Sequence, residues 1–474
     1  MTPSGGNPLE AAVGAQTVDL LISGGDVVTM NPDRDVLVSG TVAIAGNRIV
    51  AVGGTAALRR AHPDAAQIDA RGCVVTPGMI NAHQHHTGDP LVKSCIPDLL
   101  PPGASIFEWS VPIHGAHTGD DDEISATLGA LASLRLGVTT AIEAGTVAHP
   151  DRAAQAFVRA GLRATIGRWG WDIEGVPYSA PPAESLELQR EVLDAWPKGG
   201  LVEGWVTLVG HNLASDELLA GAADLARERG TGMTMHMSPT SSDPEAYLER
   251  TGRRPLAHLD DLGVLGEHLL IGHGVWLDDE EVELVLSSRS AIAYCPWAYM
   301  RLGQGVTGHG RHAEIVERGG RVALGCDADN AGDIPDLLRT AALAAAIARD
   351  TRVEPERFGA DLAFELATIR GAEAIGMADR IGSLEPGKLA DVVVHDATTF
   401  NWTPRGDVSL QLVWGTDGRT VRDVVVDGRI VVRDGVSTTV DLDALRLEAR
   451  SSADALLARA GITVPHLWPH IDAS

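Results

Sequence analysis

The strongest signal in the chain is the segment Pro77-Gly78-Met79-Ile80-Asn81-Ala82-His83-Gln84-His85-His86. The apolar and β-branched run just before it, Cys73-Val74-Val75-Thr76, predicts the start of a buried strand. Because side chains alternate across a strand, His83 and His85 should point to the same side. Two imidazoles at one strand end are suited to bind one metal ion, but histidines also collect in polar loops. The pair alone does not decide between these two interpretations.

Composition places the chain among globular proteins with a large core. It has 474 residues, 44% hydrophobic and 22% charged, enough for one large domain or two to three ordinary ones. The formal net charge of -26 argues against nucleic acids and anionic membranes as partners, because both need a basic surface. The four cysteines include no Cys-x-x-Cys pair, which disfavours a disulfide scaffold and a thiolate zinc site. Residues 1–17 show no signal-peptide pattern, so we expect a cytoplasmic protein.

Between Pro77 and Gly382, short apolar runs alternate with helical stretches rich in Ala, Leu, Glu and Arg. This alternation predicts parallel strands joined by helices, and eight strands predict an α/β fold of the (β/α)8 or TIM-barrel class. In that fold the active site lies at the C-terminal ends of the strands. The expected strands are residues 73–80, 139–143, 163–169, 204–209, 232–237, 269–272, 291–294 and 322–326, with helices at 121–136, 150–160, 185–195, 216–229 and 278–287.

Both chain ends have a different pattern from the middle. Residues 18–30 predict two short strands, and residues 41–52 predict a hairpin. Residues 392–395 predict another strand, and residues 422–432 predict a hairpin with an Asp-Gly turn. An isolated hairpin is marginal in water, so we expect the two ends to form one small, discontinuous β-sandwich domain. The expected domains are residues 1–76 with 382–440, a barrel at residues 77–381, and a C-terminal helix and tail at residues 441–474.

Polar residues recur at the ends of the predicted barrel strands. The first strand ends in two histidines, the second in a glutamate and the eighth in an aspartate, while single histidines lie near the ends of the fourth, fifth and sixth. Each of these residues alone could be a hydrogen-bonded loop residue or a helix cap. Their recurrence on one face of one barrel favours a shared site. The set consists of His83, His85, Glu143, His211, His236, His273 and Asp327.

These motifs together resemble the amidohydrolase superfamily, and within it the branch of triazine hydrolases, guanine deaminases and S-adenosylhomocysteine deaminases. The resemblance covers nearly the whole chain. It implies one Zn²⁺ per subunit, with Fe²⁺ as the alternative, held by His83, His85, His236 and Asp327. No lysine is evident at the fourth strand to bridge two metals. The motifs are Pro77-Gly78-x-x-Asn81-x-His83-x-His85, His236, Gly272-His273, Gly325-x-Asp327 and Gly382-Ser383-Leu384-Glu385-Pro386-Gly387-Lys388-x-Ala390-Asp391.

The resemblance also implies the chemistry, in which a metal-activated water attacks an electron-poor carbon and a leaving group departs. Asp327 would accept the proton of that water, and His273 would orient or polarise the attacked group. Heterocycle deaminases carry a Glu three residues after the fifth-strand His, but this chain has Pro239 there. Glu143 is therefore the first candidate for a replacement acid. Asp172, Asp329 and His211 are the others.

The predicted strand-end loops are rich in aromatic residues, namely Phe107, Trp109, Trp169, Trp171, Trp297 and Tyr299, in a chain with only 4% aromatic residues. A planar heterocyclic substrate could stack on them, although they could equally be anchors packed against the barrel rim. We expect Trp109, Trp171, Trp297 and His211 to bind substrate.

The sequence therefore predicts a metal-dependent amidohydrolase that cleaves a C–N or C–Cl bond of a heterocycle or cyclic amide. We expect a homodimer or a higher homo-oligomer that acts on a small molecule. Because Pro239 replaces the usual Glu, a metal-dependent lyase or isomerase on the same fold is the alternative. A structural protein without activity is a third possibility, against which the complete set of proposed metal ligands argues.

Overall fold

The computed structural model describes residues 17–101, 103–332 and 334–471. The first sixteen residues of the expected discontinuous domain and the last three of the expected tail lie outside the described residues. Within the described part, no helix has the length and apolar character needed to cross a membrane. All four cysteines are buried and free, in agreement with the expectation of no disulfide scaffold.

The middle of the chain contains two sheets of parallel strands, ordered as they occur in the sequence. Trp205 separates the sheets along the chain, and its N–H donates to the Ile166 carbonyl at 2.8 Å. Beyond the last strand, the N–H groups of Cys326 and Asp327 donate to the His83 carbonyl in the first strand's segment. The first sheet comprises β6 (Met79–Gln84), β7 (Val138–Glu143), β8 (Arg163–Ile166) and β9 (Val202–Gly204); the second comprises β10 (Val206–Gly210), β11 (Met233–Met237), β12 (Leu269–His273), β13 (Ala291–Tyr294) and β14 (Arg321–Leu324).

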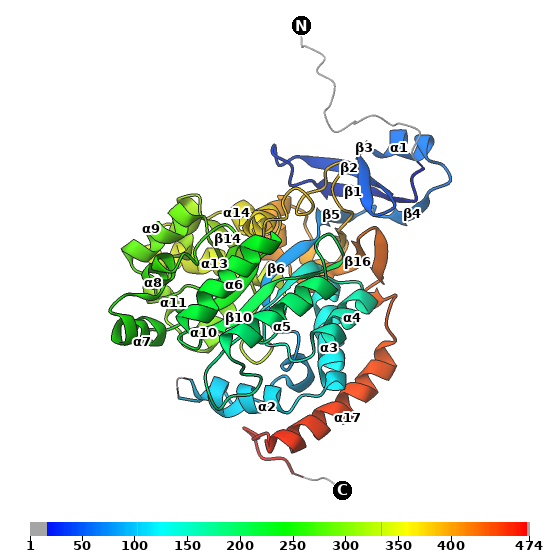
Figure 1. Cartoon of the computed structure of the whole chain (residues 1–474). Coiled ribbons are helices and arrows are strands. Elements are labelled where there is room, and N and C mark those ends of the chain that lie inside the picture. The colour runs from blue at the N-terminus through cyan, green and yellow to red at the C-terminus, as the bar shows by residue number, and fades with distance from the viewer. Residues whose placement is uncertain (1–16, 102, 333, 472–474) are drawn as a thin grey trace.

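Helices follow these strands along the chain and lie outside them (Figure 1). Local capping explains several of their ends: Thr118 and Asp278 form capping boxes that start α3 and α9, while Gly161 and Gly230 end α4 and α6 in the left-handed conformation. The principal helices are α3 (Gly119–Arg135), α4 (Pro150–Ala160), α5 (Pro182–Ala195), α6 (Asp216–Arg229), α7 (Ser242–Thr251), α8 (Pro255–Asp261), α9 (Asp279–Ser288), α13 (Leu337–Arg352), α14 (Ala360–Ala367), α15 (Ile369–Ala374) and α17 (Leu442–Ala460).

Shorter helical segments lie in the loops between these elements. Two of them, η2 and η4, are π-helical, and η1, η3 and η5 are 3₁₀ turns. Their bounds are α1 (Thr55–Ala61), η1 (Pro90–Val92), η2 (Ser105–Ser110), α2 (Val111–Gly115), α10 (Pro296–Arg301), α11 (Val306–His309), α12 (His312–Glu317), η3 (Phe400–Trp402), α16 (Val408–Leu410), η4 (Gln411–Gly415) and η5 (Gly418–Thr420).

Strands from the two chain ends pair in one nine-stranded sheet. Its joint is the antiparallel pair β5–β15, in which Thr76 lies opposite Val393. The exact extents of a separate domain stay a prediction, but strands more than 300 residues apart do share this sheet. The strands are β1 (Leu20–Val28), β2 (Val36–Ala45), β3 (Arg48–Gly54), β4 (Ala66–Asp69), β5 (Cys73–Pro77), β15 (Val392–Asp396), β16 (Val421–Val426), β17 (Arg429–Arg433) and β18 (Val436–Ser437).

Several strand predictions were wrong in detail. Residues 204–209 fall on two strands, β9 and β10, which lie in different sheets on either side of Trp205, and the strand expected at residues 163–169 ends at Ile166. Residues 73–80 do not form one strand, because the chain passes at Gly78 from β5 in the nine-stranded sheet to β6 in the middle region. A Cβ at Gly78 would lie 1.9 Å from the Thr139 hydroxyl oxygen, so only glycine fits this crossing. Residues 18–30 form the single strand β1 rather than two, with register irregularities around Gly25.

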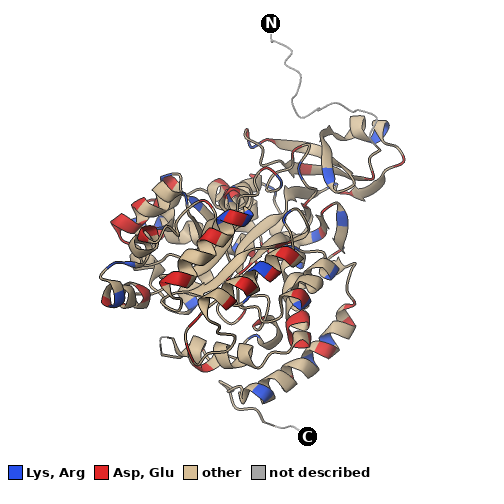
Figure 2. Cartoon of the chain, in the orientation of Figure 1, with Lys and Arg blue, Asp and Glu red and all other residues tan. Residues whose placement is uncertain are grey.

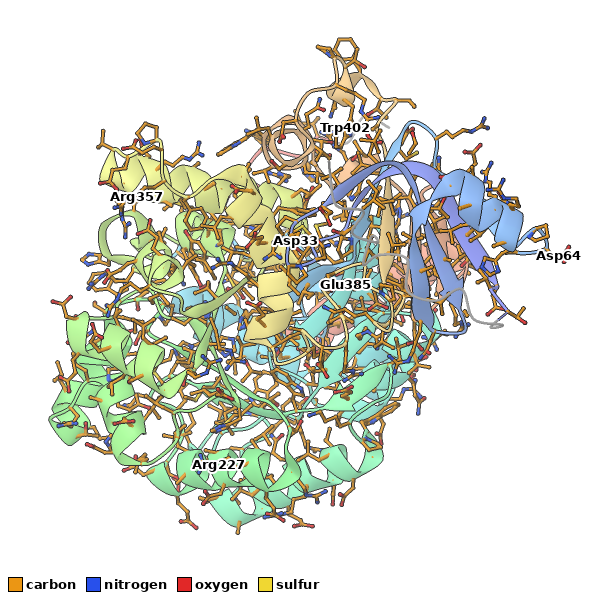
Figure 3. The ribbon with its side chains drawn as sticks, turned by 90° about the horizontal axis from the view of Figure 1, so that it is seen from above. Asp33, Asp64, Arg227, Arg357, Glu385 and Trp402 are labelled. Atoms are coloured by element: carbon orange, nitrogen blue, oxygen red, sulfur yellow. The ribbon has the colours of Figure 1, made fainter. Side chains whose placement is uncertain are left out.

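The motif at residues 382–391 joins the nine-stranded sheet to the middle region. Its Leu384 N–H donates to the Thr29 carbonyl, and Lys388 accepts from the Ile49 N–H. In the view from above, the labelled Glu385 and Asp33 lie where the two parts meet, whereas Arg227 lies on an outer helix (Figure 3). Acidic and basic residues are interspersed along the outer helices (Figure 2).

A buried ion pair ties Asp391 of this motif to β8. The Arg163 guanidinium donates to both oxygens of Asp391, at 2.8 and 3.0 Å, and both side chains are only 3% exposed. Burial opposes the charge of Arg163, but the carboxylates of Asp391 and Asp427 outweigh it and raise the arginine's pKa. A buried charge with a good partner is tolerated, whereas one that loses its partner is costly.

We predict that Asp391→Ala lowers the free energy of unfolding by about 3–5 kcal/mol, because the Arg163 guanidinium stays buried without its main partner. Thermal denaturation followed by circular dichroism measures the change. The control is Asp69→Ala, which breaks an exposed pair whose side chains are 77% (Arg71) and 50% (Asp69) exposed and should leave the midpoint nearly unchanged. Equal midpoints for the two variants would contradict the prediction.

Candidate metal centre and active site

Four histidines and one aspartate meet at the C-terminal ends of four parallel strands. His83 and His85 belong to the end of β6, His236 to β11 and His273 to β12, and Asp327 follows β14. All five residues are at most 8% exposed. The set is called the histidine–aspartate cluster below. Sequence reasoning predicted that these five residues would come together.

The distances within the cluster are short enough for shared coordination. The Nε2 atoms of His85 and His236 are 3.2 Å apart, and Asp327 Oδ1 lies 3.5 Å from His85 Nε2. Asp327 Oδ1 is also 3.8 Å from His83 Nε2, while its Oδ2 is 4.0 Å from His273 Nδ1. One carboxylate therefore faces three imidazoles from two strands.

Neighbouring groups fix the orientation of two of the rings. His236 Nδ1 donates to the Val209 carbonyl at 2.7 Å, which leaves its Nε2 without a proton and facing the cluster. His85 Nδ1 lies 2.7 Å from the Thr146 hydroxyl, and its Nε2 likewise faces the cluster. This arrangement is typical of metal-ligating histidines, whose second nitrogen is held by an outer partner.

Other ring nitrogens in the cluster lack any hydrogen bond to the described residues. Both nitrogens of His83 and Nδ1 of His273 are buried in this state. A buried polar atom without a partner is costly, so a group that satisfies several of them at once is implied. The ligand atoms of His83, His85 and Asp327 lie within 4.8 Å of one another, as do those of His83, His236 and His273. This donor set suits a zinc-like divalent ion.

Burial also sets the protonation state that such an ion requires. Burial and the neighbouring imidazoles lower the pKa values of His83, His236 and His273 well below the usual value for histidine. These rings are therefore neutral at physiological pH, the form that binds metal ions. Burial raises the pKa of Asp327, against the opposing effect of His85.

The backbone is strained at the same place. His273, Asp327, His211 and Ser238 all have positive φ angles, +83°, +64°, +53° and +53° respectively, although none is glycine. Such conformations cost about 1–3 kcal/mol each and concentrate at functional sites. All four residues lie at or shortly after the ends of β10, β11, β12 and β14.

His211 lies against the cluster, as sequence reasoning predicted. Its ring stacks on His236 with centroids 5.5 Å apart, and its Nδ1 lies 2.8 Å from Asp243 Oδ2. Burial lowers the pKa of His211, but the charge and hydrogen bond of Asp243 outweigh this and raise it overall. Pro239 is buried directly after Ser238, whose N–H donates to the same Asp243 oxygen at 2.7 Å.

The other candidate acids are engaged elsewhere. Glu143 is fully buried, and its Oε2 accepts from the backbone N–H of His86 at 2.8 Å and lies 3.1 Å from His86 Nδ1. Asp172 accepts from the Ser215 N–H at 2.8 Å, and buried Asp329 lies 3.1 Å from the Lys93 ammonium. The structure therefore does not bring Glu143 into the cluster, and its role as a proton relay stays a prediction.

The predicted aromatic residues are distributed over several environments. Trp171 is buried, donates to the Pro177 carbonyl at 2.8 Å and lies against Trp169. Trp109 is half-buried against an apolar core, and the Trp297 ring lies beneath the Arg339 guanidinium at 4.9 Å. Substrate binding by Trp109, Trp171 and Trp297 stays a prediction. Of the aromatic residues singled out from the sequence, Tyr299 contacts the cluster, with its ring 5.6 Å from that of His273.

Sequence reasoning missed the residues that support the cluster. Asp243 and Thr146 hold His211 and His85, and His312 bonds the His273 carbonyl. Asp89 joins the loop after β6 to the loop after β14 by accepting from the Asn330 amide at 2.6 Å. Asp89 and Thr146 lie in loops and Asp243 and His312 lie at helix starts, with no regular spacing from the ligands, so no sequence signal marks them.

We predict that His83→Ala abolishes stoichiometric binding of zinc to the purified protein. His83 belongs to both three-residue donor groups within the cluster, one with His236 and His273 and the other with His85 and Asp327. Inductively coupled plasma mass spectrometry measures the metal content. His395→Ala is the matched control, because His395 is another fully buried histidine but lies in the nine-stranded sheet. Full zinc content in His83→Ala, with loss in the control, would contradict the assignment.

Comparison with known proteins places the chain in a family. The amidohydrolase family matches residues 74–431, and an imidazolonepropionase-like composite domain of bacteria matches residues 42–65. The chain is 30% identical over 435 residues to a 5-methylthioadenosine/S-adenosylhomocysteine deaminase of Syntrophobacter fumaroxidans, covering 91% of this chain and 97% of that protein. It is 29% identical over 450 residues to a 5'-deoxyadenosine deaminase of Methanosarcina mazei, covering 93% and 99%.

Solved structures agree with this placement. An adenosine deaminase from Xanthomonas campestris with bound zinc superposes with a TM-score of 0.88 at 26% identity, covering 94% of this chain and 99% of that one. An atrazine chlorohydrolase from Arthrobacter aurescens complexed with zinc has the same fold, with a TM-score of 0.83 at 22% identity, covering 92% and 100%. The resemblance inferred from the motifs is thus confirmed. The chain belongs to the amidohydrolase family and is an enzyme of that family.

Proposed function

We propose that this enzyme uses one bound divalent metal ion to hydrolyse an exocyclic C–N bond of a planar heterocycle, with an aminopurine nucleoside as the favoured substrate. The observation that carries the proposal is the buried histidine–aspartate cluster, whose unpartnered nitrogens suit a metal ion. The identity of 30% and 29% to two deaminases of adenosine derivatives, over nearly the whole chain, supports the substrate class. A C–Cl bond or a cyclic amide is the less favoured target.

His83, His85, His236 and Asp327 are the proposed ligands of a single Zn²⁺, with Fe²⁺ as the alternative. An ion held there would supply Lewis-acid activation that lowers the pKa of a water molecule to about 7. Cys295 is not proposed as a ligand, although its Sγ lies within 4.8 Å of the ligand atoms of His273 and Asp327. Burial raises the pKa of its thiol well above the usual value, which disfavours the thiolate that binds a metal ion.

Asp327 is proposed to accept the proton of the attacking water. Its two oxygens face different sides of the cluster, Oδ1 toward His83 and His85 and Oδ2 toward His273. One carboxylate can therefore take a proton on one side and hand it toward the leaving amine on the other. His273, the last residue of β12, would stabilise charge that develops on the attacked ring.

The substrate pocket is proposed to lie over the cluster, with His211 on one side. Asp243 fixes the His211 ring, and that ring stacks on His236. Trp109, Trp171 and Trp297 are proposed to contact the heterocycle. We further propose that β9 and β10 act as one interrupted strand of a closed eight-stranded barrel, that residues 1–76 and 382–440 form a separate domain, and that the enzyme is a homo-oligomer.

A lyase or isomerase reaction is the second candidate, and Pro239 is the observation that favours it. Proline cannot transfer a proton, and its place after His236 is buried. The two candidates differ in their products. Hydrolysis consumes water and releases ammonia, whereas isomerisation leaves the molecular mass unchanged.

The experiment is mass spectrometry of zinc-loaded protein incubated with S-adenosylhomocysteine, 5-methylthioadenosine, guanine and aminotriazines. We expect replacement of an amino group by oxygen and release of ammonia, and loss of both with Asp327→Asn. A product of unchanged mass would support the isomerase alternative. Replacement of chloride alone, in a chlorotriazine arm, would contradict the proposed C–N target.

We predict that His273→Asn lowers kcat by about 10²-fold or more, the usual size of acid–base effects, while the zinc content persists. Glu143→Gln is the comparison, since Glu143 is the first candidate for a replacement carboxylate. Steady-state kinetics with the substrate identified above measures both. If His273→Asn keeps near-normal turnover while Glu143→Gln abolishes it with metal bound, Glu143 is the relay and the assignment of His273 is wrong.

A further inference from the structure

We propose that His312 is a positioning residue for the reaction: its hydrogen bond to the backbone carbonyl of His273 holds the His273 imidazole at the angle that faces the cluster. This inference rests on the proposed role of His273. It adds a residue from outside the barrel strands, at the start of α12, to the machinery of the site.

The contact itself is short and buried. His312 is 2% exposed, and its Nε2 lies 2.7 Å from the His273 carbonyl oxygen, across 39 residues of sequence. A carbonyl can only accept, so the proton must be on Nε2 and the bond is N–H to O=C. Burial lowers the pKa of His312 to about 4, so the ring is neutral and carries only this one N–H at physiological pH.

His273 needs such a restraint, because its backbone is strained. Its φ of +83° is unfavourable for a residue with a side chain, and it persists only where the surroundings fix it. The ladder between β12 and β13 ends one residue earlier, with Gly272 opposite Ala293. The His273 carbonyl therefore has no strand partner on that side, and the His312 N–H takes the place of one.

The His312 ring is itself held by aromatic neighbours. It stacks on Tyr294 with ring centroids 4.1 Å apart and lies 5.8 Å from Tyr299. Tyr299 in turn packs edge-on against the His273 imidazole, and its hydroxyl accepts from the Cys295 N–H at 2.9 Å. His273 is thus supported at two points, its carbonyl by His312 and its ring by Tyr299.

The surroundings of the second nitrogen of His312, Nδ1, agree with the tautomer that carries its proton on Nε2. Nδ1 is buried and has no hydrogen-bond partner among the described residues. A cavity of about 30 Å³ adjoins the ring and is bordered by Tyr294, Gly310 and apolar side chains of α13. That volume is sufficient for a water molecule, which could donate to Nδ1. An acceptor at Nδ1 again places the proton on Nε2.

Two variants separate the hydrogen bond from packing. His312→Phe keeps a ring for the stack on Tyr294 but removes the donor. His312→Gln loses the ring but can place an amide N–H near the position of Nε2. We expect His312→Phe to lower kcat about 10- to 100-fold, the usual cost of a small misplacement of a catalytic group, with KM and zinc content nearly unchanged. His312→Gln should recover most of that loss. Normal kcat in His312→Phe, or a greater loss in His312→Gln, would overturn the inference.

A spectroscopic measurement tests the contact without a substrate. When the protein is labelled with ¹³C′ on histidine and ¹⁵N on glycine, an HNCO spectrum shows carbonyl signals only from its three His-Gly pairs, 114–115, 273–274 and 309–310. His273→Asn removes, and so assigns, the signal of the pair 273–274. We expect His312→Phe to shift that signal upfield more than the other two. An unmoved 273–274 signal would show that the bond does not hold the carbonyl and would overturn the inference.

The kinetics of His273→Asn and His312→Phe together show whether the role of His312 fails alone or whether the proposed function fails as well. If His273→Asn retains turnover, the proposed role of His273 fails, and with it the catalytic part of the inference. If His273→Asn loses turnover but His312→Phe does not, the proposed function stands and His312 is only a packing residue. Thermal denaturation of each variant, compared with the wild type, shows whether a loss of activity comes from unfolding.

Discussion

Burial of four imidazoles and a carboxylate around one point is the constraint on which the rest of the structure depends. Groups of this kind are costly inside a protein when they lack partners, and both ring nitrogens of His83 lack one among the described residues. Neutral histidines beside a carboxylate are stable there once a divalent ion coordinates them. The strained backbones of His273 and Asp327 support the same conclusion, because such conformations are tolerated only where the surroundings enforce them.

The fold gathers the five cluster residues by bringing together strand ends that are far apart in the sequence. Within each parallel sheet the carboxyl ends of the strands lie on the same side. The end of β6 in one sheet meets the ends of β11 and β12 and the segment after β14 in the other. The nine-stranded sheet is fastened to this scaffold by the motif that ends at Asp391, through the buried bond to Arg163. Residues that never touch the cluster, such as Gly78 and Asp391, therefore help to fix where β6 begins.

Local signals explain which parts of the fold could be predicted from sequence. The helices Pro150–Ala160 and Asp216–Arg229 were predicted with their observed bounds, because Pro150 or the Ser215 cap marks the start and a left-handed glycine marks the end. The strand ends predicted a shared site that includes the five cluster residues, but the same argument also included Glu143, which the structure bonds to His86 instead. The break at Gly78 could not be predicted, because it depends on Thr139 and Asp391, far away in sequence. Asp243 and His312 were missed because their partners, His211 and His273, are also far away in sequence. From the sequence, each resembles an ordinary residue at a helix start.

The most direct test of the account is X-ray absorption spectroscopy at the zinc edge on the metal-loaded enzyme. The account predicts one zinc per chain, with only nitrogen and oxygen neighbours at about 2.0–2.2 Å and multiple-scattering features from histidine rings. Cys295 belongs to one possible donor group with His273 and Asp327, so the measurement can distinguish a site with this sulfur ligand from the proposed site of three histidines and one aspartate. A sulfur neighbour at about 2.3 Å, or a second metal at about 3.5–4 Å, would contradict a mononuclear site of three histidines and one aspartate.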